Sequence, residues 1–247
     1  MKRNGYTIAE AMITMAIIGV VASLTIPTFV ASQRKTIYAN SISNAVSNFE
    51  NGMSMMMVKE GVDDLLNTEA WRAIQSGDNY KMIKSTSTSK IEKFMENVNK
   101  TLSLADYATT ERKYSSLKEP NKAPSLLVGY PVRFKTKNGV EYMIDISEVS
   151  KLDEKSEVEA LKDGSNYLNK AAEVYIDING DNEPNVQGRD WFRYDLGTDG
   201  KLYPYYGQDY CIFHGKTYAD LKTKCVTNKE GHYCAAYLME NGYKMDY

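Results

Sequence analysis

Carboxylate and amide side chains concentrate in the stretch from Asp177 to Asp190, which is the part of the chain richest in metal ligands. Asp177, Asn179 and Asp181 alternate along it, and Asp190 follows closely. Oxygen ligands in such an alternating pattern are what a hard cation such as Ca²⁺ binds, at about 2.3–2.6 Å. The stretch therefore predicts a calcium site formed by these four residues.

The same stretch has a purely structural interpretation. Counted from Asp177, the twelfth position is Gly188, whereas an EF-hand loop has a bidentate glutamate there. Asn179-Gly180 is also a typical turn sequence, and Asp190 would then cap or brace the loop. Both interpretations stand as expectations, and calcium is the only cofactor that the sequence indicates.

The three cysteines, Cys211, Cys225 and Cys234, all lie near the carboxyl end. In a chain whose bulk lies outside the cytoplasm, three cysteines allow one disulfide and leave one thiol over. Three pairings are open at this point, and three free thiols are the alternative.

No catalytic set is evident from the residue types. His214 and His232 are the only histidines, and neither belongs to a ligand-spaced pair or a nucleophile motif. Cys211 precedes His214 closely, but no motif supports a thiol enzyme. The net charge is −2 and the basic residues are scattered, so a nucleic-acid groove is not expected. The sequence predicts a protein that is not an enzyme.

One long apolar run lies near the amino terminus. Residues 11–31 contain no charged side chain, and about 21 residues suffice to cross a hydrocarbon core of roughly 30 Å as a helix. Lys2 and Arg3 precede the run and favour a cytoplasmic start, but Arg34 and Lys35 follow it and weaken that argument.

Glu10 stands at the leading edge of this run, and acids at membrane depth usually mark function. A secretory signal that is cut before Ser23 is one alternative, although the apolar run continues as far as Val30. A plain single-pass anchor is another alternative. Neither of them explains Glu10.

Residues Gly5-Tyr6-Thr7-Ile8-Ala9-Glu10 resemble the class III signal of type IV pilins and type II secretion pseudopilins. In that family a membrane peptidase cuts after the glycine, the new amino terminus is methylated, and a glutamate is the fifth residue of the mature chain. The resemblance implies cleavage between Gly5 and Tyr6, methylation of Tyr6, and Glu10 as the matching acid. Tyr6 and Ala9 depart mildly from the usual residues, whereas Pro27 matches a proline common in the family.

Glu10 then has a physical role in assembly. Cleavage creates an ammonium group at Tyr6, and Glu10 of a neighbouring subunit can pair with it in an apolar filament core, where an unpaired charge is costly. The implied partners are the prepilin peptidase, other pilin or pseudopilin subunits and the membrane.

The expected organisation is a leader at 1–5, an amino-terminal helix at 6–60 with a membrane span at about 8–31, and a head at 61–247. We expect a single-pass protein of the bacterial inner membrane with the head outside the cytoplasm. The helix should continue past the span and end near Gly61, because apolar residues recur at helical spacing, namely Ile37, Ile42, Ala45, Val46, Phe49, Met53 and Met56.

The remaining chain predicts an α+β fold, in which the long helix packs on an antiparallel sheet. Lys137-Asn138-Gly139 lies between two alternating runs, which is a strong hairpin signal. The expected helices are 68–75 and 89–104, and the expected strands are 132–134, 142–144, 174–178, 191–196 and 202–205.

The resemblance also favours a disulfide between Cys225 and Cys234, because residues 225–247 look like the closing loop of some bacterial pilin-like proteins. The predicted function is a structural subunit that is cut, methylated and assembled into a type IV pilus or a type II secretion pseudopilus. The alternative is a membrane-anchored extracytoplasmic binding protein that does not assemble.

Overall fold

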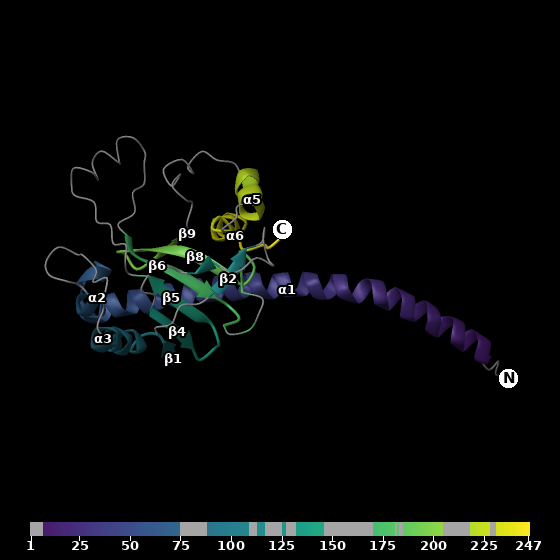
Figure 1. Ribbon diagram of the computed structural model, residues 1–247, viewed down its shortest axis with the longest axis horizontal. Coiled ribbons are helices and arrows are strands. Elements are labelled where there is room, and N and C mark those ends of the chain that lie inside the picture. Colours follow the sequence, from purple (N-terminus) through teal and green to yellow (C-terminus); the bar gives the residue numbers. More distant parts are fainter. Residues whose placement is uncertain are drawn as a thin grey trace.

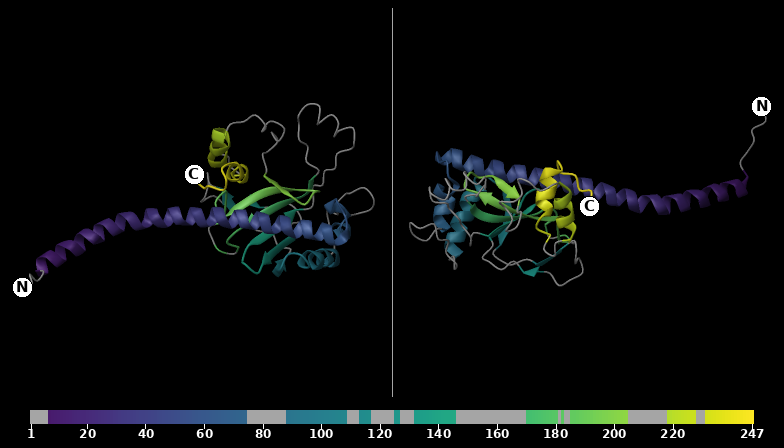
Figure 2. Two further views of the ribbon diagram at one scale, coloured as in Figure 1. Left: turned by 180° about the vertical axis from the view of Figure 1, so that it is seen from behind. Right: turned by 90° about the horizontal axis from the view of Figure 1, so that it is seen from above.

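The computed structural model describes residues 7–74, 88–108, 113–116, 125–126, 132–145, 170–180, 182, 185–204, 218–227 and 231–247. Its longest element is helix α1 (Ile8–Glu60), whose first half projects away from the head and curves gently (Figures 1 and 2). The helix has 53 residues, which is about 80 Å at 1.5 Å per residue. Gly61 ends it in a left-handed conformation, and this confirms the predicted end of the helix.

The second half of α1 buries one face against the head. Ile42, Phe49 and Met53 on this face have no exposed surface. Met56 and Met57 are buried as well, whereas Met55 is about half exposed. The methionine-rich segment is therefore mainly core packing, which suits a flexible and polarisable side chain.

The sheet confirms the predicted α+β class. Within the described residues its order is β1-β4-β5-β6-β8-β7-β2-β3, with β9 also paired to β8. Strands β1, β4, β5, β6, β8 and β9 form a continuous antiparallel group, and β7 joins β8 and β2 in parallel. The strand bounds are β1 Leu104–Ala108, β2 Lys113–Ser116, β3 Ser125–Leu126, β4 Val132–Thr136, β5 Glu141–Asp145, β6 Lys170–Asp177, β7 Val186–Gln187, β8 Trp191–Gly197 and β9 Leu202–Pro204.

The predicted β4–β5 hairpin is present, and the expected strands at 191–196 and 202–205 pair as a second hairpin, β8–β9. The β4–β5 turn has Gly139 at a φ of 88°, and the β8–β9 turn has Gly200 at a φ of 78°. The β8–β9 turn lies directly against α1, because a Cβ on Gly200 would stand 3.2 Å from the sulfur of Met57. Glycine is needed at this point for both its conformation and its size.

Two hydrogen bonds join α1 to the sheet. The Tyr142 hydroxyl donates to the Ala45 carbonyl at 2.9 Å, and the Leu202 N–H donates to Glu50 Oε1 at 2.9 Å. Tyr142 also stacks on Phe49 and Phe134. The sheet is therefore held to the helix by polar bonds as well as by apolar packing.

Three short helices lie at the end of α1 farthest from the amino terminus (Figures 1 and 2). They are η1 (Leu65–Asn67), α2 (Glu69–Ile74) and α3 (Thr88–Asn99), and Trp71 packs edge-on against Phe94 between α2 and α3. The predicted helix at 89–104 was too long. Asn99 accepts the N–H of Leu104 through its side-chain oxygen at 3.1 Å, and the chain turns there into β1.

The carboxyl-terminal region was predicted as a closing loop, but its described part contains two helices, α5 (Tyr218–Thr227) and α6 (Cys234–Glu240). Helix α6 packs against β8 and β9, and its residues Ala235 to Leu238 belong to the main core. Together with the final residues, these helices lie on the side of the head where α1 leaves it (Figures 1 and 2).

The sheet face opposite α1 is also largely buried, although an antiparallel sheet commonly leaves one face to water. Met143, Tyr175 and Trp191 form a small apolar cluster there. Beside it, Lys170 contacts both Glu173 and Asp195, at 2.7 and 3.2 Å, and Arg193 pairs with Glu173. These four charges on the face therefore compensate one another.

Candidate functional site

The amino-terminal site is built around the start of α1. Gly5 and Tyr6, the predicted cleavage and methylation residues, lie outside the described residues. Thr7 is the N-cap, and Glu10 is the third residue of the helix. The Glu10 N–H donates to the Thr7 hydroxyl oxygen at 3.2 Å, and Glu10 Oε2 accepts the Thr7 N–H at 2.9 Å and its hydroxyl at 2.8 Å.

This arrangement is a capping box, which satisfies backbone N–H groups that the helix itself leaves without acceptors. The sequence analysis missed the role of Thr7, although the pattern Thr7-x-x-Glu10 before an apolar run is a recognisable signal.

Glu10 also carries a charge that the hydrogen bonds of the capping box do not balance. Within the described residues its carboxylate makes no ion pair, so the part of its own chain that is described supplies no cation to balance it.

The first half of α1 has an apolar surface that the head does not cover. The most apolar 18-residue window has a mean hydropathy of 2.1, and none of it is buried. Met12, Ile18 and Leu24 are among the exposed residues. By length and composition, α1 is the one helix among the described residues that is able to cross a membrane.

The few polar side chains of this apolar run are satisfied within the helix. Thr14, Ser23, Thr25 and Thr28 each donate their hydroxyl to a carbonyl three or four residues earlier, at 2.8–2.9 Å. Such bonds suit hydrocarbon, where water is not available as a partner. The helix also continues through Pro27.

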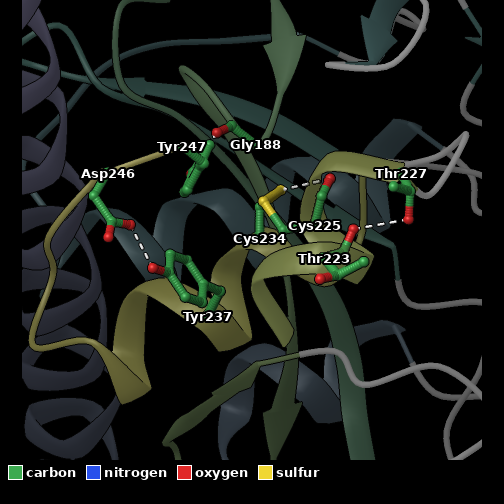
Figure 3. Close-up of a disulfide and its surroundings, with 8 residues drawn as sticks. All are labelled: Gly188, Thr223, Cys225, Thr227, Cys234, Tyr237, Asp246 and Tyr247. Carbon is green, nitrogen blue, oxygen red and sulfur yellow. Dashed lines mark hydrogen bonds between the residues drawn. A yellow bond between two sulfur atoms is a disulfide. The ribbon is translucent and has the colours of Figure 1, made fainter. Parts of the chain in front are cut away.

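The disulfide lies at the opposite end of the sequence. Cys225 and Cys234 are bonded, both have no exposed surface, and the bond joins α5 to α6 (Figure 3). The predicted pairing is confirmed. Cys211 lies outside the described residues. Structural disulfides persist in oxidising compartments, so a buried one fits a head outside the cytoplasm.

The final residues attach this helical unit to the rest of the head (Figure 3). Asp246 accepts a hydrogen bond from the hydroxyl of Tyr237 on α6 and pairs with Lys222 of α5 at 3.0 Å. The Tyr247 hydroxyl donates to the Gly188 carbonyl at 2.6 Å. The backbone carbonyl of Tyr247 accepts a hydrogen bond from the Lys35 ammonium of α1. The carboxyl-terminal segment thus contacts α1 just beyond the apolar run.

The acidic loop has the geometry of a braced turn. Asp177 Oδ1 accepts the N–H groups of Asn179 and Gly180, at 3.2 and 2.9 Å. Asp190 is buried, and it accepts the N–H of Val186 at 2.6 Å, the N–H of Asn185 at 3.1 Å and the amide of Asn179 at 3.2 Å. Burial raises the pKa of Asp190 although these hydrogen bonds oppose the change.

The calcium prediction therefore stays a prediction. Asp181 lies outside the described residues, and within them no group of three or more acidic, histidine or cysteine side chains is placed to hold a metal. The contacts of Asp177 and Asp190 match the structural alternative, in which Asp190 braces the loop. Lys135 also approaches this loop, with Nζ 3.3 Å from the position of a Cβ on Gly180.

Of the two histidines, the described residues include only His232. His232 is partly buried before α6, and burial, together with the charge of Arg193, lowers its pKa to about 4 against a smaller opposing effect of Glu173. It is therefore neutral at ordinary pH. His214 lies outside the described residues.

Comparisons with known proteins address the amino-terminal site. Residues 1–26 match the family model of the prokaryotic N-terminal methylation motif. No curated protein and no solved structure matches the chain. This motif indicates a structural subunit and implies processing by a prepilin peptidase, and together with the apolar helix α1 it fits a protein anchored in the inner membrane. The start of the chain, from residue 1 to residue 26, is a prepilin-type signal of the kind that type IV pilins and pseudopilins carry.

Proposed function

We propose that the chain is a prepilin-like subunit that is cut between Gly5 and Tyr6, methylated at Tyr6, and assembled into a type IV pilus or a type II secretion pseudopilus. The head stays outside the cytoplasm, and α1 holds the subunit in the membrane until assembly. The observation that carries the proposal is the methylation motif at residues 1–26 on an apolar helix that the head leaves uncovered.

The state of Glu10 supports assembly over a simple anchor. Its carboxylate has no cationic partner among the described residues, whereas a cut subunit has a new ammonium at Tyr6. Pairing of Glu10 with the Tyr6 ammonium of a neighbour would satisfy both charges in an apolar filament core and would set the axial register. In an anchor that does not assemble, the charge of Glu10 has no such role.

The capping box makes this idea testable with two different substitutions. Glu10→Gln keeps a hydrogen-bonding side chain of the same length, which a capping box accepts, but removes the charge. Glu10→Val removes both. If the charge sets the register, both variants should lose filaments, with a loss of roughly 3–5 kcal/mol per contact by analogy with broken buried pairs.

The measurement compares sheared filament fractions or crosslinked oligomers at equal membrane levels of each variant. Filament formation by Glu10→Gln at the level of the original chain would show that the residue serves only as a cap. Equal assembly by Glu10→Val as well would show that Glu10 has no role in assembly, whereas the absence of filaments and oligomers from the original chain would support the alternative of an anchored binding protein.

A further inference from the structure

The base of the head carries a set of exposed cations at the level where α1 leaves the bilayer. Arg34 and Lys35 are exposed and follow the apolar run, which ends at Ala31. Ala31 and Lys35 are four residues apart, about 6 Å along a helix. The headgroup layer takes up about 5–8 Å on each side of the hydrocarbon core. Lys35 therefore stands at headgroup level when α1 spans the membrane.

The carboxyl-terminal segment brings part of the head to the same level. Lys35 donates a hydrogen bond to the Tyr247 carbonyl, so the end of the segment lies beside this turn of α1. Figures 1 and 2 show the carboxyl terminus next to α1 on the side toward the amino terminus. Lys244, three residues earlier, is exposed. Arg189 is also exposed and follows Gly188, whose carbonyl accepts the Tyr247 hydroxyl at 2.6 Å.

Among the described residues, the acidic side chains in this region do not cancel these cations. The Asp246 carboxylate is compensated by Lys222 at 3.0 Å and by the Tyr237 hydroxyl. Asp190 is buried, and its carboxylate accepts hydrogen bonds from two backbone N–H groups. Glu240 is a further exposed acid on α6. The surface formed by Arg34, Lys35, Arg189 and Lys244, which we call the basal collar, is therefore net positive.

We propose that the basal collar binds anionic phospholipid headgroups and seats the head on the membrane surface before assembly. The partner is an anionic lipid surface, because clustered Lys and Arg at a membrane boundary are attracted by its negative potential. This inference rests on the proposed function, which places α1 across the bilayer with the head outside. Seating the head would limit its tilt and present every subunit to the assembly site in one orientation.

The test uses the full mature chain in lipid nanodiscs of phosphatidylcholine, with or without phosphatidylglycerol. A water-soluble reagent acetylates exposed lysines, and mass spectrometry gives the ratio of modification at Lys244 to that at Lys201. Lys201 is an internal reference, because its turn packs on Met57, about 33 Å farther along α1 than Lys35. The reagent reacts with the neutral amine and not with the protonated one. A surface potential of about −30 mV favours protonation of a nearby lysine, so phosphatidylglycerol should lower the ratio of Lys244 to Lys201 modification about threefold.

Salt of about 1 M, where the Debye length is about 3 Å, should restore the ratio. The double variant Arg34→Gln with Arg189→Gln should lose most of the lipid effect, whereas Arg72→Gln, on α2 at the far end of the head, should keep it. An unchanged ratio with phosphatidylglycerol, or a full effect in the double variant, would overturn the basal collar. Failure of the chain to enter the discs would instead count against the proposed membrane span.

Discussion

Glu10 has one task that the structure shows and a second that the proposed function assigns to it. In the single chain it closes the capping box with Thr7, which accounts for a hydrogen-bonding side chain at the first turn of α1 but not for its charge. In an assembled filament the same carboxylate would also balance a neighbour's ammonium. The two tasks are compatible, because both hydrogen bonds that Thr7 donates go to Oε2 of Glu10, so the capping box does not use Oε1.

Asp190 gives the first prediction at this scale. Replacing Asp190 by Ala would leave three donors without their acceptor, namely the buried N–H of Val186, at about 1–3 kcal/mol, and the partly buried N–H of Asn185 and amide of Asn179, at less each. We expect a loss of about 3 kcal/mol of unfolding free energy, measured by denaturation of the purified chain. Asp199→Ala is the matched control, because the Asp199 side chain is exposed and its two hydrogen bonds, from the Lys201 N–H and the Tyr203 hydroxyl, are also exposed, so its loss should stay below about 1 kcal/mol. Equal losses would contradict the bracing role.

The calcium prediction can be tested on the same loop. A bound ion should stabilise the chain by about 2.7 kcal/mol at a hundredfold excess over Kd, relative to chelator. Asp181→Ala should abolish that difference. Equal melting temperatures with calcium and with chelator would leave only the braced turn.

His232 provides a prediction about pH. Its pKa is about 4 in the folded head and 6.5 as an ordinary value, because burial and Arg193 disfavour the charged form. Between these values the unfolded chain binds a proton that the folded chain does not, so stability falls as the pH is lowered from about 6.5 to 4. The contribution is about 3 kcal/mol at most. His232→Gln should flatten this part of the stability curve, and an unchanged slope would contradict the assignment.

At the scale of elements, the close approach of the β8–β9 turn to α1 can be measured with two glycines. Gly200 and Gly242 both have a positive φ, of 78° and 58°, so alanine is strained at either position. A Cβ on Gly200 would also stand 3.2 Å from Met57 and 3.3 Å from Met53, whereas a Cβ on Gly242 would meet nothing within 4 Å.

We therefore expect Gly242→Ala to cost about 1 kcal/mol and Gly200→Ala about 1–3 kcal/mol more, in thermal or chemical unfolding. The difference between the two variants isolates the packing of the turn on the helix. Similar losses at both positions would mean that the methionines adjust without cost.

The predicted elements succeeded where short-range signals were strong. The Asn138-Gly139 turn and the flanking alternating runs produced the correct β4–β5 hairpin. Strand β1 was missed because residues 89–104 continue a helical pattern, and the helix stops at Asn99 only through a local side-chain bond to Leu104. Helices α5 and α6 were missed because the resemblance suggested a loop, and α6 is helical in a core position that the sequence pattern does not reveal.

At the scale of the whole molecule, the chain divides into an uncovered apolar half of α1 and a head built on the other half. The apolar run and the amino-terminal signal could be predicted from the sequence, because both are local patterns. The burial of both faces of the sheet was not, because it depends on contacts between distant segments, such as Lys170 with Asp195. The attachment of the carboxyl-terminal segment to Lys35 is another such contact.

The most direct measurement is mass spectrometry of the amino terminus of the protein extracted from membranes of cells that contain a prepilin peptidase. We expect the mature chain to begin at Tyr6 with a methylated amino group, and Gly5→Leu to retain the leader. A mature chain that begins at Ser23 would show a secretory signal, and an uncut chain that begins at Met1 would show a simple anchor. Either result would contradict the assignment of this protein as a prepilin-like subunit.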